Sequence, residues 1–126
     1  MRLENDIFTL FPKFNEIFFE NNLDCLVKWG RKYNKPRKRC IRLGSFNVRT
    51  NTITINPDLQ NDKIPGYLVR YVLFHEMVHA WFHKTNHKDK LYHSKNFKSV
   101  EQSFPEYRKA SRWLKKNKKF LLSNKD

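Results

Sequence analysis

The sequence predicts an α+β domain in which a small sheet packs against a central helix. Three observations support this fold class. The first segment repeats apolar residues at helical spacing, "TITIN" at 52–56 alternates apolar and polar residues, and "VRYVLFHEMVHAWFH" at 69–83 is apolar around much of a helix. At 126 residues the chain fits one domain, residues 1–126, with enough surface to bury for a real core.

An N-terminal helix is expected because apolar residues recur every three or four positions over about four turns. They are Ile7, Leu10, Phe11, Phe14, Ile17 and Phe18. The run "CLVKWG" at 25–30 is rich in strand-forming residues and predicts a first strand. The charged, proline-containing "RKYNKPRKR" at 31–39 then predicts a loop.

Two further strands are expected at about 40–48 and over "TITIN", joined by a hairpin turn at "RTN", residues 49–51. Ile53 and Ile55 alternate with threonines, so one face of the later strand is apolar and the other is polar. Together with the first strand they predict a small sheet of about three strands, antiparallel or mixed.

The central helix is expected over Pro65–Lys84, because its apolar residues surround much of the helix axis. They are Leu68, Val69, Val72, Leu73, Met77, Val78, Trp81 and Phe82. Two C-terminal helices are predicted at about Ser94–Ser103 and at about Pro105–Asn117. Serine is a good N-cap and proline suits the first helical turn, so both starting residues agree with the pattern.

The net charge of +14 favours a polyanionic partner such as nucleic acid. Between Cys25 and Pro57 there are nine basic residues and no acidic one, and residues 108–125 add eight more basic residues. Four residues of the first run are candidate nucleic-acid contacts: Lys35, Arg37, Lys38 and Arg39.

Cys25 and Cys40 are too few and too widely spaced for a CxxC half-site or a disulfide scaffold, and we expect reduced, buried thiols. The N-terminus "MRLENDIFTLFPKF" carries acids, where a secretory signal needs a basic start and an unbroken apolar run. No segment approaches the ~18 consecutive apolar residues of a membrane span. We therefore expect a soluble cytoplasmic protein with no membrane partner.

The strongest chemical signal is "FHEMVHAWFH" at 74–83. His75 and His79 lie four residues apart, so on a helix both imidazoles project from one face, about 6 Å apart along the axis, and can reach one ion. With Glu76 they form the HExxH arrangement, in which two histidines hold zinc and the glutamate is general base on the activated water. His83 lies about 12 Å along the helix from His75, too far to bind the same ion.

A catalytic zinc needs a third protein ligand from outside this helix. Four downstream residues are candidates, and spacing alone does not choose among them: His87, His93, Glu101 and Glu106. Three protein ligands and an open position favour hydrolysis, whereas four favour a structural zinc in a basic DNA- or RNA-binding module. A latent zincin, with its metal covered by a chain segment or a partner, is the remaining alternative.

Several segments together resemble the SprT-like and YgjP-like zinc metallopeptidases. After the N-terminal helix they run, over most of the chain, in the order "VKWG", "IRLGSFN", "TITINPDL", "VRYVLFHEMVHAW", "HSKNF" and "FPEYRKASRWLKKN". The resemblance implies a zincin-like SprT-type domain whose Zn²⁺ is held by His75, His79 and His93 of "HSKNF", the last in preference to His87. It also implies Glu76 as general base in the hydrolysis of a protein or peptide substrate.

Such a substrate is expected to lie extended along a sheet edge beside the central helix. The residue that stabilises the oxyanion is not selected by the pattern, and Tyr92 and Tyr107 are both candidates. The number of subunits is likewise not defined by the sequence.

Overall fold

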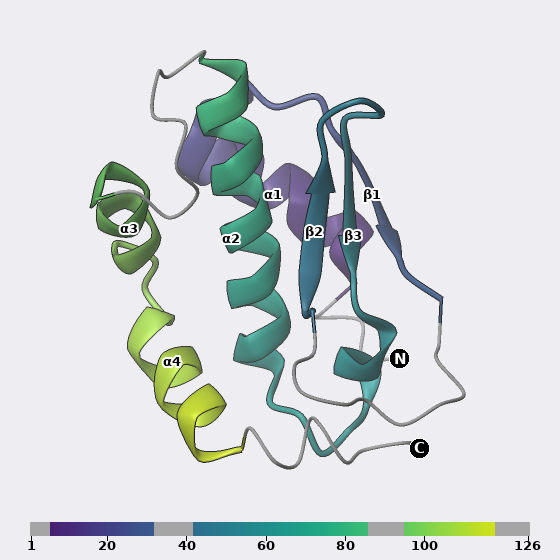
Figure 1. The fold of residues 1–126 in the computed structure, drawn as a ribbon, viewed down its shortest axis with the longest axis vertical. Coiled ribbons are helices and arrows are strands. Elements are labelled where there is room, and N and C mark those ends of the chain that lie inside the picture. The colour runs from purple at the N-terminus through teal and green to yellow at the C-terminus, as the bar shows by residue number, and fades with distance from the viewer. Residues whose placement is uncertain (1–5, 32–41, 86–94, 118–126) are drawn as a thin grey trace.

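The computed structural model describes residues 6–31, 42–85 and 95–117 (Figure 1). In chain order the elements are α1 (Ile7–Phe19), β1 (Leu26–Trp29), β2 (Gly44–Asn47), β3 (Thr52–Ile55), the 3-10 helix η2 (Pro57–Gln60), α2 (Gly66–Lys84), α3 (Lys95–Gln102) and α4 (Tyr107–Lys116). This order confirms the predicted α+β class, with an N-terminal helix, a small sheet, a central helix and C-terminal helices.

The three strands form one mixed sheet with β3 in the middle. β1 runs parallel to β3 and β2 runs antiparallel to it, so that Val27 and Phe46 both lie opposite Ile53. The alternation predicted for β3 is confirmed, because Ile53 and Ile55 are fully buried while the two threonines of the strand are half-buried. The hairpin turn predicted at 49–51 connects β2 with β3.

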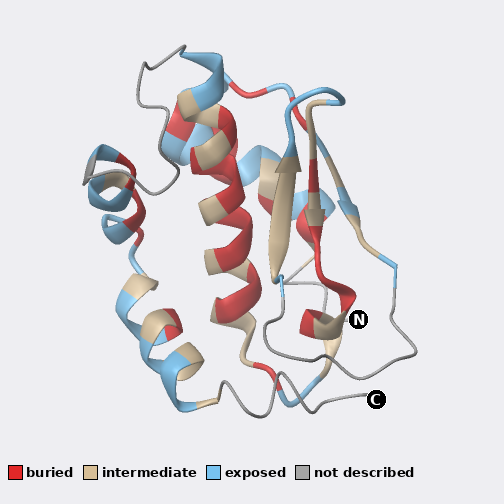
Figure 2. Cartoon of the chain, viewed as in Figure 1, coloured by how far each residue is buried: buried red, intermediate tan, exposed pale blue. Residues whose placement is uncertain are grey.

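The helix α2 is the central element, with the sheet on one side and α3 and α4 on the other (Figure 1). Most of its length is buried, as Figure 2 shows. Because neighbours cover it on both sides, apolar residues can occupy most of its circumference. The predicted buried central helix is confirmed, and it begins at Gly66, directly after Pro65.

The helix α1 is fixed at both ends by side-chain hydrogen bonds. Asp6 caps its start, since its carboxylate accepts a hydrogen bond from the Phe8 amide at 3.1 Å. In its second half, the buried Asn15 side chain donates to the Leu23 carbonyl at 2.7 Å and accepts from the Leu23 amide at 3.1 Å. These bonds attach α1 to the segment that enters β1.

The helix α4 begins two residues later than the sequence predicts. Residues 103–106 form a turn, in which the Phe104 amide donates to the Glu101 carbonyl at 3.2 Å, and the regular helix starts at Tyr107. A two-pronged ion pair holds α4 against α2. Nε of Arg70 lies 2.7 Å from Oε1 of Glu106, and Nη2 lies 2.9 Å from Oε2.

Three smaller predictions concern the cysteines, the membrane and a helix cap. Cys25 is a buried free thiol, as predicted, whereas Cys40 lies outside the described residues. None of the helices in the described ranges is long and apolar enough to cross a membrane. The predicted N-cap Ser94 also lies outside the described residues.

Candidate metal centre

His75 and His79 lie on one face of α2, packed against α3. Their ring centroids are 4.9 Å apart, with the rings edge to face. The buried Phe97 ring of α3 lies 5.2 Å from the His75 ring and 4.3 Å from the His79 ring. Imidazoles at this spacing can both reach one ion to which each nitrogen bonds at about 2 Å.

Glu76 follows His75 directly and is only 5% exposed. Its carboxylate faces the start of β2, because a Cβ placed on Gly44 would stand 3.1 Å from Oε2 of Glu76 and 2.9 Å from Cγ1 of Val72. A glycine within a strand permits this close approach, since any side chain would occupy the space. The first residue of β2 and the glutamate of the HExxH motif therefore face each other at close range.

Burial raises the pKa of the Glu76 carboxyl to about 7. Charges on His75 and Arg42 lower the pKa in part, and Glu101 raises it further. Burial dominates because a carboxylate removed from water is destabilised relative to its neutral form. A carboxyl that titrates near neutrality can both accept and release a proton, which is the property a general base needs.

Glu101 of α3 is buried beside the first histidine. Its Oε2 atom contacts Nδ1 of His75 and accepts a hydrogen bond from the Tyr71 hydroxyl at 2.7 Å. Tyr71 precedes His75 by one turn of α2, and its burial, with the bond to Glu101 adding to it, raises the pKa of the hydroxyl. Side chains from two helices thus meet at one carboxylate oxygen.

The described residues supply only part of a metal site. Within 6–31, 42–85 and 95–117, no three His, Cys, Asp or Glu side chains are grouped so as to hold a metal ion. His93 and its rival His87 lie outside these ranges. Of the two acidic candidates, Glu101 meets His75 at Nδ1 and Glu106 is paired with Arg70. Two imidazoles on one helical face, with a glutamate beside them, fit zinc when a further ligand completes the set.

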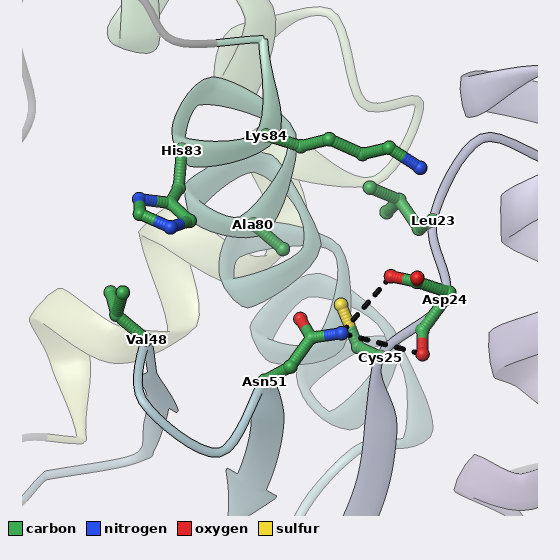
Figure 3. A pocket seen from close by; sticks show the side chains of 8 residues that line it. All are labelled: Leu23, Asp24, Cys25, Val48, Asn51, Ala80, His83 and Lys84. Carbon is green, nitrogen blue, oxygen red and sulfur yellow. Dashed lines mark hydrogen bonds between the residues drawn. The ribbon is translucent and has the colours of Figure 1, made fainter.

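A separate hollow of about 230 Å³ lies at the C-terminal end of α2 (Figure 3). It is lined by Leu23, Asp24, Cys25, Val48, Asn51, Ala80, His83 and Lys84. The exposed His83 therefore belongs to this hollow, which His75, Glu76 and His79 do not line. Burial raises the pKa of the Cys25 thiol, which keeps the thiol protonated at neutral pH.

Sequence reasoning did not identify Gly44, Asn56 or Tyr71 as residues that shape the site. The Asn56 side chain accepts from the Asp58 amide at 2.8 Å and donates to the Arg42 carbonyl at 3.0 Å, which fixes the chain just before β2. A glycine within a strand and an asparagine before a proline were usable signals, because they indicate close approach and a capped turn. Tyr71 carries no comparable local signal.

The residues predicted to contact nucleic acid lie outside the described ranges: Lys35, Arg37, Lys38 and Arg39. Tyr92 also lies outside them, and the Tyr107 ring packs 5.9 Å from the Tyr71 ring. A cationic surface is nevertheless present on α4, where five basic side chains are exposed: Arg108, Lys109, Arg112, Lys115 and Lys116.

Two of the solved structures with a similar fold are metallopeptidase zymogens. The metallopeptidase zymogen of Methanocaldococcus jannaschii, jannalysin, matches with a TM-score of 0.61 and 19% identity, over 92% of this chain and 97% of that chain. The metallopeptidase zymogen of Pyrococcus abyssi, abylysin, matches with a TM-score of 0.58 and 23% identity, over 88% of this chain and 94% of that chain. This likeness confirms the predicted zincin-like fold.

Sequence comparison supplies the family. No sequence among curated proteins matches the chain. The sequence model of the SprT-like family, in contrast, matches residues 7–115, a span that includes every element from α1 to α3 and nearly all of α4. The protein therefore belongs to the SprT-like family.

Proposed function

We propose that the protein is a zinc-dependent peptidase that hydrolyses peptide bonds with Glu76 as general base. The observation that carries the proposal is one face of α2, where the paired rings of His75 and His79 stand beside a buried glutamate whose pKa is about 7. Membership of the SprT-like family and the fold shared with metallopeptidase zymogens support it.

His75, His79 and His93 would hold the metal. A zinc ion bound there supplies a Lewis acid that polarises the peptide carbonyl and makes water more acidic. Glu76 accepts a proton from the attacking water, because burial has raised its pKa to about 7. It then gives that proton to the amine nitrogen as the carbon–nitrogen bond breaks. Phe97 packs against both histidine rings and helps to hold them on this face of α2.

The edge of β2 is the proposed binding site for an extended peptide. In the described part of the chain β2 pairs with β3 alone, so its other edge has no strand partner. A peptide added there would form backbone hydrogen bonds with β2 and pass Gly44, where the backbone comes close to Glu76. This placement favours protein or peptide substrates in an extended conformation.

The test is Glu76→Gln in the full chain, with zinc content and hydrolysis of casein or a fluorogenic peptide both measured. We expect zinc to remain stoichiometric while hydrolysis falls by about a hundredfold or more, because only the proton acceptor is removed. Glu16→Gln is the matched control, since Glu16 is an exposed glutamate on α1. A Glu76→Gln protein as active as its parent would rule the proposal out.

The third ligand is tested separately with His93→Ala. We expect zinc affinity to fall by about tenfold or more, because removal of one of three protein ligands weakens the whole coordination shell. His87→Ala serves as the matched control. If only His87→Ala weakens zinc binding, His87 replaces His93 in the proposed ligand set.

A second candidate function is recruitment to DNA or RNA, and the cationic surface of α4 favours it. The exposed acids among the described residues all precede α2: Glu16, Glu20, Asp24 and Asp62. From α2 onward, Glu76 and Glu101 are buried and Glu106 is paired with Arg70. The five exposed cations of α4 therefore have no exposed acid beside them in the described C-terminal part, as expected for a surface that binds phosphates.

Fluorescence anisotropy with a labelled single-stranded oligonucleotide tests this candidate. Replacing Arg108, Arg112 and Lys116 with Gln should weaken binding and reduce the slope of log K against log salt by about two, at roughly 0.7 per phosphate contact. The control replaces the exposed Lys13, Lys28 and Lys63, which lie on α1, on β1 and before α2. Equal losses in both triple variants would mean that net charge alone drives binding and would exclude α4 as the interface.

A further inference from the structure

We infer that Glu101, held by Tyr71, orients the His75 imidazole for the metal and acts through His75, without binding the ion itself. The inference rests on the proposed zinc site. It assigns to α3 a positioning role, in addition to its packing against α2.

The Glu101 carboxylate lies at Nδ1 of the His75 ring. A metal bound through Nε2 would lie on the other side of the ring. Oε2 of Glu101 contacts Nδ1 of His75, so an ion bound to His75 would take the other ring nitrogen, Nε2. The same oxygen accepts a hydrogen bond from the Tyr71 hydroxyl at 2.7 Å, which helps to fix the position of the carboxylate. Glu101 is 8% exposed, so water competes little for these contacts.

The chemical effect of such a contact is to select one form of the imidazole. A neutral histidine carries its proton on one nitrogen and a lone pair on the other. A carboxylate at Nδ1 favours the form with the proton on Nδ1, which leaves the lone pair on Nε2 for zinc, and it also makes that lone pair more basic. Glu101 would therefore prepare His75 as a ligand before any metal arrives.

Two observations argue against direct binding of the metal by Glu101. Oε2 is already engaged by His75 and Tyr71. In addition, Glu101 meets His75 at Nδ1, and the two ring nitrogens of an imidazole point in different directions, so an ion on Nε2 would lie away from this oxygen.

The first experiment measures the His75 form directly, by long-range ¹H–¹⁵N NMR of the full-length, metal-free protein. We expect the proton on Nδ1 in the parent and in Glu101→Gln, because the amide oxygen still accepts it. In Glu101→Ala the population should shift toward the form with the proton on Nε2. A merely structural role for Glu101 would leave the balance between the two forms unchanged.

The second experiment measures zinc affinity in the same proteins. Glu101→Ala should bind zinc about ten to a hundred times more weakly than the parent, which is typical when the partner of a ligating histidine is removed. Glu101→Gln should recover much of this loss, and Tyr71→Phe should show a smaller loss in the same direction. Glu16→Ala, a change at an exposed glutamate of α1, is the control and should leave affinity unchanged.

The outcomes separate this inference from the proposed function. If Glu101→Gln loses as much zinc affinity as Glu101→Ala while the His75 form does not change, Glu101 binds the metal directly and the inference is overturned. Zinc affinity unchanged in Glu101→Ala would also overturn it, with the peptidase proposal left standing. A parent protein that binds zinc but hydrolyses no peptide would contradict the proposed function and leave the role of Glu101 intact.

Discussion

At the residue scale, the chemistry proposed for Glu76 depends on what surrounds its carboxylate. The start of β2 and the side chain of Val72 exclude water from it, and this burial raises its pKa to about 7. An exposed glutamate in the same HExxH motif would remain ionised well below neutrality and would be a weaker base. Because Gly44 has no side chain, the β2 backbone can lie close enough to Glu76 to bury its carboxylate.

Gly44→Ala tests this dependence. The added Cβ would stand 2.9 Å from Cγ1 of Val72 and 3.1 Å from Oε2 of Glu76, so one of the two elements has to move. We expect the free energy of unfolding to fall by about 1–3 kcal/mol, as for other overpacked interiors. Peptidase activity should fall by about a hundredfold, because a displacement of about 1 Å can misplace a catalytic group.

Chemical denaturation and a peptide-hydrolysis assay measure the two effects. Ser45→Ala, at the next position of β2, is the control because it adds no atoms to the strand and should preserve most of the activity. Wild-type activity in Gly44→Ala would show that the approach of β2 does not position Glu76.

Sequence analysis located the site residues that lie close together in the chain and could not assign a role to those that meet only in the folded structure. His75, Glu76 and His79 are close in the chain, so the geometry of one helix is enough to bring them together. Glu101 comes from α3, and its spacing to His75 says nothing about which ring nitrogen it meets. The choice between a ligand and a positioning residue requires tertiary structure.

At the element scale, α2 is packed between the sheet on one side and the helices α3 and α4 on the other (Figure 1). Apolar side chains pack between α2 and the sheet, whereas α3 adds the polar contacts of Glu101 with Tyr71 and His75 to its apolar ones. The helix α4 is joined to α2 by the ion pair Arg70–Glu106, whose side chains are 27% and 24% exposed. This pair is partly shielded from water, and it forms a two-pronged contact of the kind that fixes orientation.

Glu106→Gln should reveal a pH-dependent part of the stability. The hydrogen bonds from Arg70 hold the pKa of Glu106 below its ordinary value of 4.5. A carboxyl with a lowered pKa stabilises the fold above the unfolded pKa, and this contribution is lost as the pH falls through the folded pKa. At neutral pH we expect the variant to be less stable by about 1 kcal/mol, a modest value because the pair is partly exposed.

Urea unfolding at several pH values checks this expectation. The difference between parent and variant should shrink as the pH falls from 4.5 through the lower pKa that Glu106 has in the folded parent, because the native carboxylate becomes protonated there. Glu16→Gln is the control, since Glu16 is exposed. A difference that is the same at neutral and acidic pH would assign the loss to packing instead of charge.

Most elements could be predicted to within a few residues because each has a local periodic pattern. The sequence could not specify that β1 pairs parallel with β3, since alternation along a strand carries no information about its partner. The late start of α4 could not be predicted either. The turn at 103–106 is stabilised by backbone hydrogen bonds, and the side-chain pattern does not indicate them.

At the scale of the whole molecule, the proposed metal would join parts of the chain that lie far apart in sequence. His75 and His79 belong to α2, whereas His93 belongs to the segment before α3. An ion bound to all three would hold this segment against the central helix. Metal binding and folding should then be linked, because the complete site exists only in the folded chain.

Removal of zinc should therefore lower the melting temperature. At a zinc concentration about a hundredfold above Kd, binding stabilises the folded state by about 2.7 kcal/mol, so EDTA should lower the melting temperature by roughly 10 °C. Differential scanning calorimetry with and without EDTA measures this shift. The double variant His75→Ala/His79→Ala should show no shift, and an unchanged parent would argue that zinc is not bound.

The strand order has a further consequence, for the sequence of folding events. The β2–β3 hairpin closes through a four-residue turn at 48–51 and can form within about 1–10 μs. The pairing of β1 with β3 joins Leu26 to Thr52, which lies 26 residues later in the chain, so a longer loop has to close before it forms. Gly44 lies on the hairpin that forms first. The strand facing Glu76 would thus be ordered early, and substitutions in β1 should mainly accelerate unfolding instead of slowing folding.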